Sequence, residues 1–339
     1  MTAPTESIVH VLRPSGPRRE PRAQLRGRQP EDAALAEVRA VIGAPPEGGH
    51  PRDRLIELLH NLNDAHHGLF ERHLVALAHE MRLPVVEVFE VASFYHHFEI
   101  LKDDAVAPRL TLRVCGGLSC RLAGAADLIE RLPALVGADV RVVEAPCIGR
   151  CEQAPAALAG QRAVPRANLD ALVEAARGDG QPDAAAAAAP EAIGYAAYRS
   201  AGGYALAAAV VNGETDPDSV LRAMEDSGLR GLGGAGFPAG RKWRIVRNQA
   251  APRLMAVNID EGEPGTFKDR HYLERDPHRF LEGMLVAAQV VGTEAIYIYL
   301  RDEYHDARRL LQRELAALQA DPPCPLPRIE LRRGAGAYI

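Results

Sequence analysis

The chain has 339 residues and a formal net charge of -5, and at about 150 residues per domain its length predicts two or three domains. Charged residues interrupt every hydrophobic segment, and no apolar run reaches the roughly 18 residues that cross a bilayer. We therefore expect a soluble protein without direct membrane insertion. The acidic balance argues against nucleic acid as a partner.

Residues 1–32 lack the basic segment and apolar core that mark a secretory signal. Their prolines, arginines and acidic residues are typical of a disordered tail. Without an export signal, we expect a cytoplasmic protein.

Residues 33–105 show helical periodicity. Apolar residues recur at helical spacing over 55–62 and again over 69–81, and Gly68 and Pro84 end these two stretches. The segment VVEVFEVASFYHHF predicts a third helix. We assign a small helical bundle to this part of the chain.

Residues 106–176 change to a strand pattern. RLTLRV and VRVVEA flank an amphipathic helix, which gives a strand, helix, strand order, and each strand runs directly into a pair of cysteines. Residues 177–195 are rich in alanine, proline, glycine and aspartate and are predicted to be a linker.

Residues 196–339 alternate helical and strand patterns, which predicts an α/β domain with a mainly parallel sheet. A short helix has Asp216 or Asp218 as its N-cap and stops at Gly228. RLMAVNID is expected to be a buried strand. The chain reaches a glycine turn directly after the strand-like RIELRR, so we expect this domain to be incomplete at its C-terminus.

Four of the five cysteines form two close pairs, C-x4-C and C-x3-C: Cys115, Cys120, Cys147 and Cys151. Four thiolates from loops at neighbouring strand ends can converge on a [2Fe-2S] cluster or a structural zinc ion. Zinc sites more often use two-residue spacings, and the adjacent glycines can donate backbone hydrogen bonds to cluster sulfurs. The pattern favours iron–sulfur and leaves zinc as the alternative; Cys324 is expected to be an ordinary loop thiol.

The helical segment is also rich in histidine, and a metal site there needs to be considered. The spacings match no H-E-x-x-H or similar ligand pattern. We therefore expect surface and core histidines at His60, His66, His67, His73, His79, His96 and His97.

The segment GLGGAGFPAGRKW begins at Gly231 and ends at Trp243. Glycine-rich loops let backbone amides approach an anion or a flat ring closely. A Rossmann assignment is weak, because no clear strand precedes the segment and no acidic residue follows at the required spacing. Lys242 is placed where its charge can meet a phosphate, and Phe237 and Trp243 offer faces for stacking.

A second polar motif, VNIDEGEPGTFKDR at residues 257–270, follows the predicted strand directly. Its polar side chains are Asn258, Asp260, Glu261, Glu263, Lys268 and Asp269. Carboxylates at this position can accept hydrogen bonds from ribose hydroxyls or flavin N–H groups. A solvated, turn-rich loop is the alternative.

These motifs carry a family resemblance. GLRGLGGAGFPAGRKW, NIDEGEPGTFKDR and RRGAGAYI closely resemble the FMN-binding subunit of respiratory complex I and its relatives in NAD-reducing hydrogenases and NAD-dependent formate dehydrogenases. EVFEVASFYHHF and the two cysteine pairs resemble the thioredoxin-like [2Fe-2S] subunit of the same assemblies. The resemblance implies a helical bundle plus a thioredoxin-like [2Fe-2S] domain, followed by an α/β FMN/NAD-binding domain that is incomplete at its C-terminus.

The resemblance also implies roles for individual residues. The FMN and its phosphate would be cradled by Gly231, Gly233, Gly234, Ala235, Gly236 and Lys242. Asn258, Asp260 and Glu261 would surround the isoalloxazine and ribityl chain. Phe237 would stack on the NAD adenine, Glu263 would bind a nucleotide ribose, and Tyr338 would begin the second flavin loop. The C-G-E-E sequence and the [4Fe-4S] motif of the family are expected only in a full-length chain.

The function implied is that of a diaphorase, in which hydride passes between NAD(H) and FMN while iron–sulfur centres carry single electrons. The partners implied are the catalytic subunit of a formate dehydrogenase or hydrogenase, or other complex I-type subunits. The fusion of two subunits, Leu232 in place of arginine, and VNIDE without the cysteine usual before its asparagine favour a diaphorase subunit of a soluble hydrogenase or a formate dehydrogenase over complex I. Of these two, the resemblance favours the formate dehydrogenase beta subunit. A non-catalytic zinc adaptor is the rival from another class.

Overall fold

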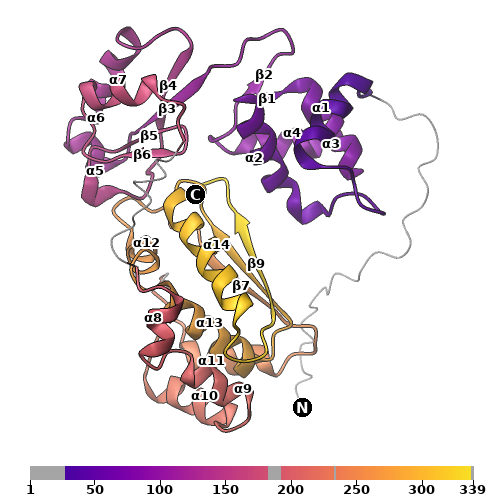
Figure 1. Ribbon diagram of the computed structural model, residues 1–339, viewed down its shortest axis with the longest axis vertical. Coiled ribbons are helices and arrows are strands. Elements are labelled where there is room, and N and C mark those ends of the chain that lie inside the picture. The colour runs from indigo at the N-terminus through magenta and orange to yellow at the C-terminus, as the bar shows by residue number, and fades with distance from the viewer. Residues whose placement is uncertain (1–26, 182–191, 233, 337–339) are drawn as a thin grey trace, which may run out of the picture.

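The computed structural model describes residues 27–181, 192–232 and 234–336. These residues form three parts: a helical part, a part with a four-stranded sheet, and a larger part with a three-stranded sheet (Figure 1). Most of the predicted tail lies outside the described residues, as does the middle of the predicted linker. None of the described helices has both the length and the apolar character that a bilayer crossing requires.

The helical part confirms the three helices predicted from periodicity and adds one before them. Its helices are α1 (Asp32–Ile42), α2 (Leu55–His66), α3 (Glu71–Met81) and α4 (Val85–Phe94), with a 3-10 turn η1 (Arg52–Arg54) and two short strands, β1 (Leu69–Phe70) and β2 (Ile100–Leu101). The leucines of α2 form a buried face, and Leu59 and Leu62 have no exposed surface. This face, together with α1 and α3, makes a separate hydrophobic core.

The second part is built around the predicted strand, helix, strand unit. It contains β3 (Leu110–Cys115), α5 (Leu118–Leu122), α6 (Ala125–Arg131), η2 (Leu132–Ala134), β4 (Val140–Ala145), η3 (Cys151–Gln153), β5 (Ala157–Ala159), β6 (Arg162–Val164) and α7 (Leu169–Arg177). The strand order is β4-β3-β5-β6, with β3 and β4 parallel. The antiparallel hairpin of β5 and β6 was not predicted, because its strands have only three residues each.

The third part is an α/β unit. It contains α8 (Tyr195–Ser200), α9 (Ala205–Val211), α10 (Pro217–Asp226), α11 (Ala239–Arg247), β7 (Leu254–Ile259), α12 (Lys268–Leu273), α13 (Pro277–Val291), β8 (Ala295–Leu300), α14 (His305–Ala320) and β9 (Arg328–Arg333). The order β7-β8-β9 is parallel throughout, so the predicted parallel sheet is confirmed. The Asp216 carboxylate accepts from the Asp218 amide and caps α10.

RLMAVNID forms a strand as predicted, β7, but the prediction that this strand is buried was wrong. β7 forms one edge of the three described strands, and its residues alternate in exposure, from Leu254 at 58% exposed to Ile259 at 3%. Met255 and Val257 pack against the core, whereas the opposite side chains face outward. An apolar sequence run does not reveal that a strand is covered on one face only.

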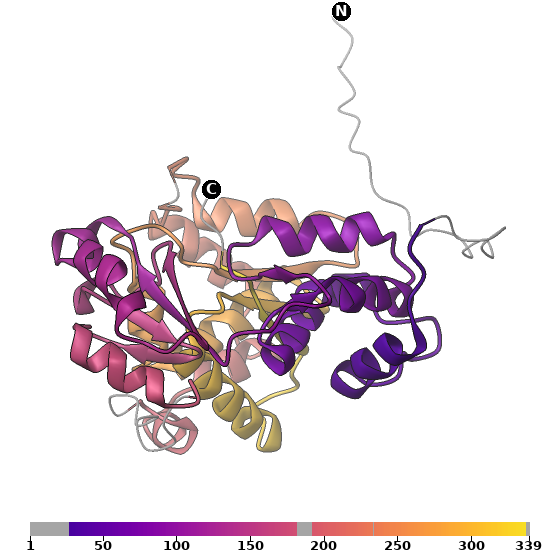
Figure 2. The same cartoon turned by 90° about the horizontal axis from the view of Figure 1, so that it is seen from above.

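The three parts contact one another. The helical and four-stranded parts lie beside each other over one end of the third part (Figures 1 and 2). Charged contacts join β9 to α2: Arg332 Nη1 donates to Glu57 at 3.2 Å, and Arg333 Nη1 donates to Asp64 at 2.5 Å. Segments far apart in the chain therefore meet at this junction.

Candidate functional site

The four paired cysteines converge at one edge of the four-stranded sheet. Cys115 ends β3 and Cys120 lies in α5, while Cys147 and Cys151 follow β4. Because β3 and β4 are parallel neighbours, the loops after them emerge side by side. The sulfurs of Cys147 and Cys151 lie 3.4 Å apart, and all four cysteines are free thiols.

The thiols perturb one another. The hydrogen bond with Cys115 lowers the pKa of the Cys120 thiol to about 7, and a second hydrogen bond of Cys115 raises the pKa of Cys147. Burial raises the pKa of Cys151. A metal centre binds the thiolate form, so four neighbouring thiols release their protons to solvent when they bind a metal together.

Backbone amides surround these sulfurs. The amide of Gly265 donates to the Cys151 sulfur at 3.2 Å, and Gly149 and Ala156 donate to Cys147 and Cys120. Amide donors stabilise thiolate and sulfide charge and tune a cluster's potential. The converging thiols and their amide donors therefore fit a [2Fe-2S] cluster.

The cysteine loop is bonded to the predicted acidic motif. Arg301, directly after β8, donates through Nη2 to the Cys147 carbonyl at 2.6 Å and through Nη1 to the Glu261 carbonyl. Arg270 in α12 donates through Nε to the Gly149 carbonyl at 3.1 Å and also pairs with Glu152. Two buried guanidinium groups thus join two motifs that lie more than a hundred residues apart.

Glu261 is 9% exposed, and protein donors surround its carboxylate. The amides of Asp269 and Arg270 at the start of α12 donate to it at 2.8 and 3.2 Å, and the Tyr304 hydroxyl donates at 2.9 Å. Burial raises the pKa of Tyr304, so its hydroxyl keeps the proton that it donates. Glu261 therefore holds the acidic loop against α12, and its predicted role beside the flavin stays a prediction.

The glycine segment forms an open loop with internal bonds. The Gly231 amide donates to the Phe237 carbonyl at 2.9 Å, and Arg230 donates to the Gly236 carbonyl at 3.0 Å. Gly234 has φ of 97°, and no other atom lies within 4 Å of the position that a Cβ would take. The loop thus leaves its amides approachable by a bound group, while Gly233 lies outside the described residues.

Lys242 sits in α11, which begins directly after this loop. Its side chain is exposed and makes no hydrogen bond or ion pair among the described residues. A free ammonium beside the positive end of a helix is suited to bind a phosphate. Phe237 is 43% exposed and offers a ring face, whereas Trp243 is partly buried against the hydrophobic core.

The other predicted binding residues lie on or near the two motifs. Asn258 and Glu263 are exposed, Asp260 is half-buried, and Ala235 is exposed in the glycine loop. The Asn258 side chain accepts from the Asp260 amide at 2.9 Å, which shapes the turn after β7. The prediction for Tyr338 falls outside the described residues. All of these assignments stay predictions.

Sequence reasoning missed the residues that connect the two motifs: Gly265, Arg270, Arg301 and Tyr304. It also missed that His60, His97 and Asp302 are buried next to one another. The only local signal was a run of charged residues after the strand EAIYIYL. Their partners lie in distant segments, so spacing along the chain could not identify them.

The fold and the site define a class: a thioredoxin-like [2Fe-2S] ferredoxin unit joined to an FMN-binding unit. Residues 40–177 match the family described as thioredoxin-like [2Fe-2S] ferredoxin, and residues 224–339 match the Nuo51 FMN-binding domain. The chain therefore carries both of these domains, and it is a homologue of NADH-quinone oxidoreductase and NAD-reducing hydrogenase subunits.

Individual relatives cover different parts of the chain. An NADH-quinone oxidoreductase subunit of Rhizobium meliloti is 43% identical over 152 residues, which are 42% of this chain and 36% of the relative. The NAD-reducing hydrogenase HoxS subunit alpha of Cupriavidus necator is 30% identical over 328 residues, which are 85% of this chain and 54% of the relative. The chain thus spans about half or less of the length of these curated relatives.

A solved structure agrees with this assignment. A chain in the crystal structure of NAD+-reducing [NiFe]-hydrogenase in the H2-reduced state superposes with a TM-score of 0.66 at 33% sequence identity. The match covers 84% of this chain and 52% of that one.

Proposed function

We propose that this chain is the diaphorase module of a larger complex and moves electrons between NAD(H), FMN and iron–sulfur clusters. The observation that carries the proposal is the bonding of the four-thiol loop to the acidic motif, through the Gly265 amide at Cys151 and through Arg301. When bound, FMN exchanges a hydride with nicotinamide, and a [2Fe-2S] cluster takes single electrons.

In this proposal, the chain's own residues bind and orient the cofactors. Lys242 and the open amides around Gly234 would hold the FMN phosphate. Phe237 would stack on the adenine of NAD, and Glu263 would bind a nucleotide ribose. No side chain of the chain needs to act as a general acid or base, since the redox chemistry belongs to the cofactors.

Among the possible complexes, we propose a beta subunit of an NAD-dependent formate dehydrogenase. Fusion of the two domains in one chain supports a soluble diaphorase over complex I, because the complex I relative covers 42% of this chain whereas the hydrogenase relative covers 85%. That match also favours a second candidate, the diaphorase of an NAD-reducing hydrogenase. Leu232 and the motif VNIDE also argue against complex I, and the formate assignment rests on the family resemblance of the motifs.

The proposal about the flavin site is tested by Lys242→Ala in the full-length protein. Loss of one charge-assisted hydrogen bond to phosphate costs about 1.5–3 kcal/mol, so we expect FMN to bind at least tenfold more weakly. The readout is FMN content after purification and FMN affinity by fluorescence quenching. Lys102→Ala, an exposed lysine of the helical part paired with Glu71, is the matched control. Unchanged FMN affinity in Lys242→Ala would refute the assignment.

The electron donor is tested on the purified native complex. NAD reduction driven by formate, and not by hydrogen gas, would support the formate dehydrogenase proposal, and the reverse would support the hydrogenase. Quinone reduction by NADH would indicate complex I. A colourless full-length protein that contains zinc and no iron would instead support the zinc adaptor.

A further inference from the structure

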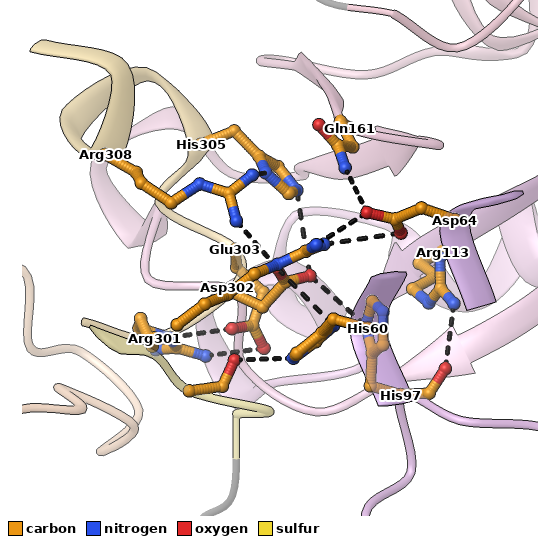
Figure 3. A network of polar contacts seen from close by, with 12 residues as sticks. His60, Asp64, His97, Arg113, Gln161, Arg301, Asp302, Glu303, His305 and Arg308 are labelled. Atoms are coloured by element: carbon orange, nitrogen blue, oxygen red, sulfur yellow. Dashed lines mark hydrogen bonds and ion pairs between the residues drawn. The ribbon is translucent and has the colours of Figure 1, made fainter. Parts of the chain in front are cut away.

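A buried group of metal-binding residue types, which includes none of the four cysteines, lies at the junction of the helical and α/β parts (Figure 3). His60 comes from α2, His97 follows α4, and Asp302 follows β8. Their exposed fractions are 0%, 8% and 2%. One ligand atom from each residue lies within 4.8 Å of the others.

The tautomer of His60 leaves a lone pair facing this group. Its Nε2 lies 2.8 Å from the Gly334 carbonyl, which can only accept, so Nε2 carries the ring proton. Its Nδ1 therefore carries a lone pair; this atom is buried, has no hydrogen-bond partner among the described residues, and lies 4.0 Å from Asp302 Oδ1. A buried acceptor without a donor is costly, and it needs a ligand to offset the cost.

His97 supplies the second imidazole ring of the group. Its Nδ1 lies 3.4 Å from Asp302 Oδ2, and its Nε2 is buried without a hydrogen-bond partner in the described part of the chain. A neutral imidazole with a free nitrogen lone pair is the form that binds metal.

His305, the third histidine beside Asp302, is not suited to be a ligand. Arg308 donates to its Nδ1 at 3.1 Å, which places the ring proton on Nε2. That Nε2 lies 3.8 Å from Asp302 Oδ2 and can only donate toward the carboxylate. His305 therefore serves as an internal control, because it is a neighbour of the carboxylate without a free lone pair.

Arg333 and Arg308 are the two arginines that also face the Asp302 carboxylate. Arg333 Nε donates to Asp302 Oδ1, and Arg308 Nη1 lies 3.9 Å from the same oxygen. The hydrogen bond orients the carboxylate, as outer partners of metal ligands do. Ca²⁺ and Mg²⁺ need several oxygen ligands and this group offers one carboxylate, whereas its two imidazole nitrogens favour a transition-metal ion.

The ligand spacing is close to that of a zinc site, and a cavity adjoins one of the ligands. Zinc bonds of about 2.0–2.2 Å place tetrahedral ligand atoms about 3.4 Å apart. His97 Nδ1 and Asp302 Oδ2 already have this separation, whereas the His60 ring must move closer to the carboxylate. A cavity of about 80 Å³ at the meeting of the three parts is lined by His97, His305 and Arg333. Among the proposed ligands, His97 lines this cavity, where a water ligand can be accommodated.

We propose that His60, His97 and Asp302 bind one transition-metal dication, Zn²⁺, with water as the remaining ligand. Two ligands come from the helical part and one from the α/β part, so the ion fastens the [2Fe-2S] half of the chain to the FMN half.

The test is metal content and zinc X-ray absorption on the full-length, iron-loaded protein. We expect stoichiometric zinc whose first shell is nitrogen and oxygen at about 2.0–2.1 Å, without sulfur at about 2.3 Å. This readout separates the proposed site from zinc that occupies the four-cysteine site. Wild-type protein that takes up no zinc, or holds it only through sulfur, overturns the proposal without the need of any variant.

Variants provide a second test. His60→Ala should weaken zinc binding by more than the roughly 10- to 100-fold that loss of an outer-shell partner costs, while iron and FMN content stay unchanged. His305→Gln should retain zinc. Should His60→Ala bind zinc with wild-type affinity, or should His305→Gln lose it as completely as His60→Ala does, the ligand set is wrong.

Discussion

The backbone amide of Gly265 donates a hydrogen bond to the sulfur of Cys151 at 3.2 Å, although 114 residues separate them. Gly265 belongs to the acidic motif and Cys151 to the second cysteine pair. A peptide group of the FMN-binding domain therefore supports a ligand of the proposed cluster. The second cysteine pair and the acidic motif share a structural boundary, so a change in the acidic loop is expected to alter the electronic environment of the proposed cluster.

The first prediction concerns this bond. Gly265 has φ of 87°, with no other atom within 4 Å of an added Cβ, so Gly265→Ala adds backbone strain of about 1–2 kcal/mol without a clash. The loop should relax and weaken the donation to Cys151, which makes the reduced cluster less stable and lowers its midpoint potential. Potentiometric titration followed by EPR measures this. Gly228→Ala, with φ of 65° and equally open surroundings, should leave the potential unchanged.

Gly149 supplies a steric prediction at the same boundary. Its φ is 72°, and an added Cβ would lie 2.8 Å from Tyr304 Cζ and closer still to the hydroxyl. Because Tyr304 is completely buried, Gly149→Ala should cost roughly 1–3 kcal/mol from overpacking in addition to strain. Gly124→Ala, with φ of 95° in open space, should cost the strain alone. Urea unfolding gives the free energy of unfolding of both variants. Equal losses of stability would show that the contact with Tyr304 does not constrain the loop.

The cysteine assignment predicts a difference among thiols. Replacing Cys120 or Cys147 with serine should abolish stoichiometric iron, because a buried hydroxyl is a poor substitute for a thiolate ligand. Cys324→Ser should retain the iron, since Cys324 belongs to a separate hydrophobic cluster. Iron content and the visible spectrum measure both. Full iron in Cys120→Ser would remove it from the ligand set.

A pH prediction follows from Glu314 in α14. Desolvation opposes its charge, but hydrogen bonds from His278 at 2.8 Å and from Arg313 outweigh it, so the pKa of Glu314 is lowered from 4.5. Its stabilising contribution is therefore present above pH 4.5 and is lost as the pH falls through the lower, folded-state pKa. Glu314→Gln should destabilise the protein by about 1.5–3 kcal/mol at pH 7.

Urea unfolding at several pH values checks this pH dependence. The difference in free energy of unfolding between wild type and Glu314→Gln should narrow below pH 4.5, as the wild-type carboxylate becomes protonated. Glu174→Gln, which removes an exposed pair with Arg177 on α7, should change stability little at any pH. A gap that widens in acid would contradict the argument.

The sequence by itself determined many of the elements and the two cysteine pairs. Periodicity located α2 and α3, strand patterns located β3 and β4, and alternation predicted the parallel sheet. The cysteine spacings identified four thiols that do converge. These features depend on residues close together in the chain, whose local geometry a pattern expresses directly.

Only the tertiary structure decided how these segments meet. It left β7 half exposed, turned the Glu261 carboxylate toward α12 and Tyr304, and set Gly265 on Cys151. It also brought His60 and Asp302 together. Such contacts arise when separately formed parts bury surface against each other, and the hydrogen bonds across that surface depend on its three-dimensional shape, which no local spacing encodes.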